Sequence, residues 1–249
     1  MSYRDVYEKW LSSSALSEAE KEELRSISGD EKEIESRFFA PLEFGTAGLR
    51  GTMCVGLHQM NIHVIRWATQ GFANVICAEG EEAKRRGVAL CMDCRNHSME
   101  FARAAAEVCA ANGIHVRIFE SLRPTPELSF AVREYGCQAG INVTASHNPK
   151  EYNGYKVYWS DGAQLPPQHA AAIARELEQI DIFTGIRRME FDDAKAQGLI
   201  EIMGAETDER FMSHVMAMVN DRESMAKVAD TFHMVYTPFH GCGWKLVPE

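Results

Sequence analysis

Residues 88–119, VALCMDCRNHSMEFARAAAEVCAANGIHVRIF, alternate between two kinds of pattern. The first five, Val88–Met92, form a short apolar run that predicts a buried strand. Residues 99–111 have the apolar spacing of a helix, Ser98 is the expected cap, and an Asn-Gly pair ends the pattern. Ile114–Phe119 predicts the next strand. This strand–helix–strand order is typical of a layered α/β domain.

The same alternation continues outward from this stretch. Ala139–Thr144 and Tyr155–Trp159 predict two more strands, and Phe232–Tyr236 predicts a strand close to the C-terminus. Capping-box patterns at residues 17–20 and 30–33 predict short helices within the first 40 residues. Further helices are expected over residues 62–76, 127–135, 166–180 and 207–219.

The 249 residues carry a formal net charge of −10, and this charge is unevenly distributed. Residues 41–160 hold 12 basic and 11 acidic side chains, so the acidic excess lies outside them. Nucleic-acid binders normally have a clear basic excess, and the composition therefore argues against a nucleic-acid partner. Because an anionic ligand is bound most easily where negative charge is scarce, we expect a ligand site in the middle segment.

The sequence also argues against a membrane or secreted protein. It has no run of 18 apolar residues and no apolar core behind a basic N-terminus. Its seven cysteines lack framework spacing, which predicts reduced thiols and a cytoplasmic protein. Cys91-x-x-Cys94 leaves open a zinc or redox site. However, a zinc ribbon needs a second pair and a redox pair opens a helix, so we favour buried thiols.

The stretch most indicative of chemistry is TASHNPKEYNGYK, residues 144–156, where a polar loop joins two predicted strands. Ligands bind at the carboxyl ends of strands in open α/β sheets. Ser146 is the loop hydroxyl that has small and basic neighbours. Asn148 precedes a proline, which favours an extended, fixed backbone. Lys156 is expected to point back toward Ser146 from the beginning of the next strand.

A serine hydrolase is the competing interpretation of this loop. In an extended segment the side chains of Ser146 and His147 point to opposite sides, so the histidine is a poor base for the serine. The G-x-S-x-G elbow is also missing. We therefore do not favour hydrolysis.

Five motifs occur together in this chain. They are FGTAGLRG at Phe44–Gly51, D-x-R-x-x-S at Asp93–Ser98, PTPEL at Pro124–Leu128, TASHNP with NGYK at Thr144–Lys156, and TPFHGCG at Thr237–Gly243. In type and order they resemble motifs of the α-D-phosphohexomutases, the phosphoglucomutase/phosphomannomutase superfamily. The longer strings Leu42–Gly51 and Asn153–Trp159 are most similar to its phosphoglucomutase/phosphopentomutase branch.

The resemblance implies a layered α/β domain with a mixed sheet, followed by the truncated start of a second α/β domain. It divides the chain into N-terminal helices packed on domain I (1–40), phosphohexomutase domain I (41–190), and a linker with the beginning of domain II (191–249). The family's D-G-D-x-D-R metal loop, sugar-recognition loop and R-x-S-G-T phosphate clamp have no match. We therefore expect the opening portion of a longer enzyme.

The implied activity is that of an isomerase that interconverts sugar 1- and 6-phosphates, or pentose 1- and 5-phosphates, through a phosphoserine and a bisphosphorylated sugar. Ser146 would carry the phosphoryl group. Arg50 would bridge phosphate through its forked guanidinium, and Lys156 would act as general acid/base or as a fixed positive charge. The implied ligands are a phosphosugar substrate and a sugar bisphosphate activator. The motifs do not choose among glucose, mannose and pentose.

The resemblance also implies a binding set. His147, Asn148 and Lys150 would bind phosphate, and Mg²⁺ would bridge the phosphate oxygens on Ser146, with its aspartate ligands absent from this chain. Because nothing else holds the metal or the distal phosphate, the isolated chain is expected to be inactive. An incomplete second domain is expected to favour self-association, although the oligomeric state is not determined. The alternative is a complete phosphosugar-binding or interaction module without turnover.

Two of the five motifs contain polar residues that we do not assign to the site. Asp93 and Arg95 are interpreted as a salt bridge at the entry of a helix, without ligand contact. His240 is interpreted as a packed loop histidine.

Overall fold

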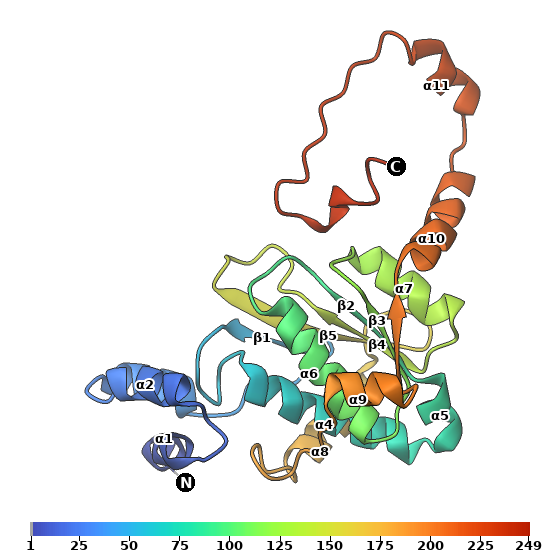
Figure 1. The fold of residues 1–249 in the computed structure, drawn as a ribbon. Coiled ribbons are helices and arrows are strands. Elements are labelled where there is room, and N and C mark those ends of the chain that lie inside the picture. The colour runs from blue at the N-terminus through green and yellow to red at the C-terminus, as the bar shows by residue number, and fades with distance from the viewer. Residues whose placement is uncertain (1) are drawn as a thin grey trace.

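The computed structural model describes residues 2–249, and a mixed six-stranded sheet lies at its centre (Figure 1). Its strands are β1 (Leu49–Thr52), β2 (Val88–Met92), β3 (Val116–Phe119), β4 (Ala139–Val143), β5 (Tyr152–Trp159) and β6 (Ile200–Met203). They lie in the order β1-β5-β4-β2-β3-β6. Strands β4, β2, β3 and β6 run parallel, whereas β5 is antiparallel to both β4 and β1. The expected layered α/β fold with a mixed sheet is confirmed.

Helices cover both faces of this sheet. They are α1 (Tyr3–Ser12), α2 (Glu18–Ser26), α3 (Glu31–Phe38), α4 (Ile62–Ala78), α5 (Glu81–Arg86), α6 (Ser98–Ala111), α7 (Thr125–Glu134), α8 (Pro167–Leu177), α9 (Phe191–Ala196), α10 (Ala205–Ala217) and α11 (Arg222–Val228), with a 3₁₀ turn at Cys242–Trp244. The larger core lies under α4, α6 and α8, and a smaller one lies under α7. Every residue of β2 and β4 is buried, as expected for central strands that are covered on both faces.

The N-terminal helices pack on the main domain through aromatic residues. The ring of Trp10 lies edge-to-face with Phe38 at 5.7 Å and with His63 of α4 at 5.7 Å. Tyr7 is buried, and its hydroxyl donates to the carbonyl oxygen of Leu24 at 3.0 Å. Helices α1, α2 and α3 are therefore continuous with the core.

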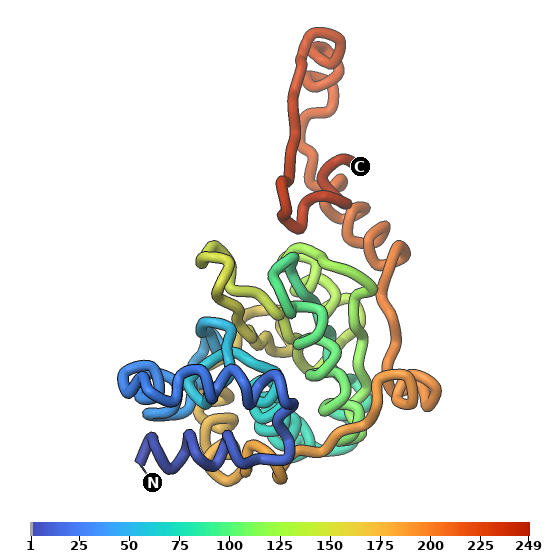
Figure 2. Tube along the Cα trace, turned by 60° about the vertical axis from the view of Figure 1, so that its left-hand side comes forward, coloured from blue at the N-terminus to red at the C-terminus, as the bar shows by residue number. Residues whose placement is uncertain are grey.

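The C-terminal part of the chain leaves this compact body. Figures 1 and 2 show α10 leading away from the sheet, the chain turning at α11, and the last residues returning toward the body. Its apolar side chains are largely exposed, including Met234 at 72% and Val235 at 95%. Within residues 2–249, no helix combines the length and the apolar character needed to cross a bilayer.

The structure corrects three expectations about the elements. Phe232–Tyr236 is not a strand, because no neighbouring strand is there to pair with it. The strands β1 and β6 were not expected, since four residues carry little periodicity. Ser98 is the first residue of α6 and not its cap, a position that His97 takes with φ 62°. Because β6 pairs with β3, we propose that the first domain extends past residue 190 to residue 203.

Candidate functional site

The candidate site lies where the parallel strands β2, β3 and β4 end. Three loops leave this edge of the sheet, beginning at Asp93, Glu120 and Thr144. Strand β5 runs antiparallel to β4 and therefore begins at the same edge, with Tyr152. Sheet topology thus brings together side chains that are far apart in the sequence.

Ser146 stands in a left-handed conformation, with φ 58°. Its backbone N–H donates to the hydroxyl of Thr144 at 3.0 Å, and its side chain is exposed. The Oγ of Ser146 lies 3.4 Å from Nδ1 of His147. The expectation that these side chains diverge was wrong, because the segment is not extended at Ser146. His147 forms no ion pair with a carboxylate within residues 2–249, so the third member of a hydrolase triad is not in place.

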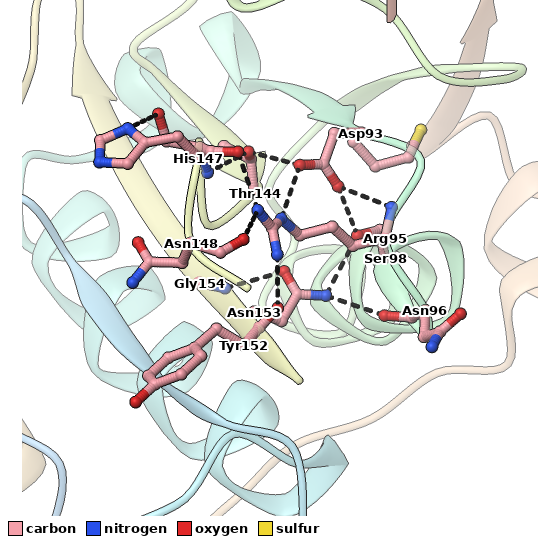
Figure 3. A network of polar contacts seen from close by, with 12 residues as sticks. Asp93, Arg95, Asn96, Ser98, Thr144, His147, Asn148, Tyr152, Asn153 and Gly154 are labelled. Carbon is pink, nitrogen blue, oxygen red and sulfur yellow. Dashed lines mark hydrogen bonds and ion pairs between the residues drawn. The ribbon is translucent and has the colours of Figure 1, made fainter. Parts of the chain in front are cut away.

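Arg95 holds the backbone of the loop (Figure 3). Its Nη1 donates to the carbonyl oxygens of Pro149 and Tyr152 at 2.8 and 3.0 Å. Its Nη2 donates to those of Ser146 and Asn148 at 2.8 and 2.7 Å. One guanidinium therefore binds four carbonyl groups that neither helix nor sheet satisfies.

Asp93 supports Arg95 from the end of β2. Its Oδ2 accepts a hydrogen bond from Thr144 Oγ1 at 2.5 Å and lies 3.4 Å from Nε of Arg95. Its Oδ1 accepts from Ser98 Oγ at 2.9 Å and from the backbone N–H of Arg95 at 3.0 Å. The expected salt bridge between Asp93 and Arg95 is present. This salt bridge fixes the serine loop, a use that the sequence pattern did not indicate.

Arg50 and Lys156 lie on one face of the sheet. Arg50 is paired with Gly154 in register, and Lys156 is two residues further along β5, so both side chains point to the α7 face. Nη1 of Arg50 donates to Oδ1 of Asn148 at 3.0 Å. Burial, together with the charge of Arg50, lowers the pKa of Lys156, whereas Asp93 opposes this shift. Because β5 begins at Tyr152 and not at Tyr155, Lys156 is its fifth residue, and the expectation that it lies at the beginning of the strand was wrong.

Two glycines permit the close backbone packing beneath the loop. A Cβ on Gly48, which has φ 76°, would lie 1.8 Å from the carbonyl oxygen of Tyr155. A Cβ on Gly154 would lie 2.6 Å from the carbonyl oxygen of Thr144. Any side chain at either position would therefore push β1 or the serine loop away from β5.

A cavity of about 760 Å³ opens beside the loop. Ser146, Asn148 and Lys150 line it together with the loop after β2 and the C-terminal segment. Arg50, His147 and Lys156 do not belong to its lining. His240 does line the cavity, so the expectation of a packed histidine was wrong. The sequence feature that could have indicated its position is the Gly-rich turn at residues 240–243, which follows a predicted strand. Another cavity, of about 570 Å³, lies away from this edge, and mostly apolar residues of α1, α4, α8 and the segments 41–44 and 178–182 line it.

The thiols near the site differ in exposure. Cys91 is buried, its Sγ donates to the carbonyl oxygen of Arg123 at 3.1 Å, and burial raises the pKa of its thiol. Cys94 is exposed and lines the cavity. The expectation of two buried thiols therefore holds for Cys91 and was wrong for Cys94.

The donor set at the loop does not fit a magnesium site. Both oxygens of Asp93 are engaged by protein donors. Within residues 2–249, no group of three or more His, Cys, Asp and Glu side chains is placed to hold a metal ion. Since Mg²⁺ takes six ligands, mostly oxygens, the Ser146 hydroxyl and its neighbours do not suffice.

Comparisons with known proteins match this arrangement to one family. Residues 41–182 match the family model for phosphoglucomutase/phosphomannomutase, alpha/beta/alpha domain I. Human phosphopentomutase is 41% identical over 157 residues, which cover 61% of this chain and 26% of that protein. A phosphoglucomutase from Staphylococcus saprophyticus is 33% identical over 219 residues, which cover 88% of this chain and 38% of that protein. The chain thus spans about a quarter to two fifths of the length of these relatives.

Solved structures agree with this match. A protein from Thermus thermophilus, provisionally called a phosphomannomutase, superposes with a TM-score of 0.60 at 26% identity and covers 79% of this chain and 39% of its own. Parafusin, a phosphoglucomutase from Paramecium in its open form, has a TM-score of 0.60 at 19% identity and covers 84% of this chain and 41% of its own. The second likeness supports the fold alone.

Proposed function

The chain belongs to the phosphoglucomutase/phosphomannomutase family, and on that premise we propose that it supplies the phosphoryl-carrying serine loop of a sugar-phosphate mutase. The observation that carries the proposal is the state of Ser146. This serine is exposed, is held in a left-handed conformation, and stands on a loop whose carbonyls are bound by Arg95. Strained residues persist where the surrounding structure fixes them, and they are common at functional sites.

In the proposed reaction, a sugar monophosphate hydroxyl attacks the phosphorus on Ser146. The new sugar O–P bond forms while the bond from phosphorus to Oγ breaks, which leaves a sugar bisphosphate. One proton passes from the sugar hydroxyl to the amine of Lys156 and from there to Oγ. The reverse transfer from the other phosphate completes the isomerisation. The lowered pKa of Lys156 supports this role, because the amine accepts a proton only after losing its own.

Arg50 of β1 and the remaining side chains of the serine loop are proposed to bind phosphate. Arg50, fixed by its hydrogen bond to Asn148, would supply a permanent forked charge, and His147 and Lys150 would add donors. Phosphoryl transfer depends chiefly on positioning and charge stabilisation, which this set provides. The resemblance implies Mg²⁺ as well. Because the residues described here do not form its site, the steps above use protein groups alone.

Binding of a phosphosugar without turnover is the second candidate function for these residues. It is favoured by the hydrogen bonds of Asp93, because both of its carboxylate oxygens accept from protein donors and are not free to bind a metal ion. The two candidates differ in a direct assay. Conversion of glucose 1-phosphate to glucose 6-phosphate by the 249-residue chain would contradict binding alone.

The test of the mutase proposal is Ser146→Ala in the protein made from its complete gene. Mutase activity should be lost, whereas the control Ser28→Ala, at a serine in the turn between α2 and α3, should retain it. Retained activity in Ser146→Ala would exclude the phosphoserine mechanism. The measurement should be made with glucose, mannose and pentose phosphates, because the described residues do not choose among them.

A further inference from the structure

The cavity at Ser146 has a second wall that comes from the C-terminal segment. Ser146, Asn148 and Lys150 line one side, and Phe239 and Trp244 belong to the lining from residues 239–244. These two rings are 84% and 49% exposed, respectively. A polar, basic loop therefore shares its cavity with two exposed aromatic rings.

The backbone of this second wall is constrained. Phe239 has φ 49°, a left-handed conformation that costs free energy for a residue with a side chain. Its N–H donates to Oγ1 of Thr237 at 3.3 Å, and the N–H of Gly241 donates to the carbonyl oxygen of Pro238 at 2.8 Å. The turn that presents the Phe239 ring is thus held by local hydrogen bonds.

A charged cluster ties the same segment to the sheet. Nζ of Lys245, one residue after Trp244, lies 2.6 Å from Oδ2 of Asp208 and 3.3 Å from Oε1 of Glu120. Asp208 is bound in turn by the fully buried Arg123, through contacts of 2.7 and 3.0 Å. Because Arg123 and Glu120 belong to the loop after β3, the aromatic wall is anchored to the edge of the sheet that carries the candidate site.

We propose that Phe239 and Trp244 form an aromatic subsite, on which the apolar C–H face of a sugar ring stacks while residues 146–150 hold its phosphate. The proposal rests on the proposed function and adds a stacking contact for the sugar ring. A sugar phosphate has both an anionic group and a ring with an apolar face. Ligand cavities commonly combine aromatic walls with a few placed polar groups, and this cavity has both.

The test is calorimetric titration of the 249-residue chain with α-D-glucose 1-phosphate and, separately, with inorganic phosphate. Phe239→Ala and Trp244→Ala should each weaken glucose 1-phosphate binding about fivefold and leave phosphate binding unchanged, since only the sugar contacts the rings. Phe232→Ala is the matched control, because Phe232 is 65% exposed in the same segment but outside the cavity. It should change neither affinity.

A conservative variant controls for the possibility that the alanine variants misfold. Trp244→Phe keeps an aromatic ring and should retain most of the glucose 1-phosphate affinity. The subsite is overturned if Trp244→Phe weakens binding as much as Trp244→Ala, if phosphate binding falls in parallel, or if all variants bind glucose 1-phosphate equally well. By contrast, failure of the unaltered chain to bind either ligand would contradict the proposed function itself.

Discussion

Nη2 of Arg95 donates to the carbonyl oxygen of Ser146 at 2.8 Å, so a residue that follows β2 fixes the backbone of the exposed serine that follows β4. The same guanidinium binds three further carbonyls of the loop. Arg95 is thus a positioning residue. It leaves the Ser146 hydroxyl free while it determines where that hydroxyl stands.

Arg95→Lys should loosen the loop. A lysine keeps the charge but lacks the planar fork of N–H groups, so it cannot bind four carbonyls. We expect phosphate affinity to fall about tenfold, since hydrogen bonds from a charged donor are worth about 1.5–3 kcal/mol each. Amide hydrogen exchange over residues 146–152 should become faster. Arg85→Lys, at an exposed arginine of α5, should change neither readout, and a rigid loop in Arg95→Lys would contradict the role.

The conformation of Ser146 predicts opposite effects for two small substitutions. Glycine adopts φ near 58° freely, whereas the left-handed conformation destabilises the folded state of an alanine variant by about 1–2 kcal/mol. The greater backbone freedom of unfolded glycine offsets part of this difference. Ser146→Gly should therefore melt about 2–4 °C above Ser146→Ala in a thermal scan. If the alanine variant proves equally or more stable, Ser146 does not hold this conformation in solution.

Lys156 predicts a pH dependence of phosphate binding. Burial and the charge of Arg50 lower the pKa of Lys156 below its ordinary value of 10.5. As pH rises, Lys156 therefore loses its positive charge earlier than an ordinary lysine, and affinity for inorganic phosphate should fall before pH 10.5 is reached. Lys156→Arg stays charged throughout this range, so its affinity should fall less steeply. Parallel pH profiles for the two proteins would exclude a contribution from Lys156.

Glu127 predicts a pH dependence of stability. Burial and the neighbouring Asp208 raise the pKa of Glu127 from 4.5 to about 8, although Arg123 and Lys245 act in the opposite direction. The folded chain thus keeps a proton that the unfolded chain releases above pH 4.5, and stability falls as pH rises from there to about 8. Glu127→Gln has no carboxyl group to ionise, so its stability should not fall in this way.

The melting temperature of Glu127→Gln should exceed that of the unaltered chain by at least about 3 °C at about pH 8, since 1 kcal/mol corresponds to about 2–4 °C at this size. The difference between the two melting temperatures should become smaller as the pH is lowered toward the ordinary pKa of a glutamate. A constant difference across this range would show that Glu127 is ionised in the folded chain.

The central strands could be predicted from the sequence, because both are buried on both faces. As a result, β2 is a continuous apolar run and β4 has only Asn142 as a polar residue. The strands β1 and β6 could not, since each has four residues at an edge of the sheet. The predicted strand at Phe232–Tyr236 has the right composition but no partner. A strand forms only where another strand lies beside it, and the local sequence pattern does not show whether such a neighbour is present.

The site could be predicted only in part. A polar loop after an apolar strand singled out Ser146, and the structure places that serine at the carboxyl edge of the sheet. The function of Arg95 could not be predicted, because its four acceptors are backbone carbonyls more than fifty residues away. Side-chain identity does not reveal where such acceptors will lie. The contribution of Phe239 and Trp244 to the cavity likewise depends on the return of a distant segment.

The most direct test of the central claim is phosphopeptide mapping of the protein purified from the cells that produce it. Mass spectrometry of the peptide containing residues 144–150 should find a phosphoryl group on Ser146. After incubation with a sugar monophosphate that carries isotopically labelled phosphate, the label should appear on Ser146, because each turnover returns the substrate's own phosphate to the serine. An unmodified Ser146, or a phosphoryl group that does not exchange with the labelled sugar monophosphate, would contradict the account.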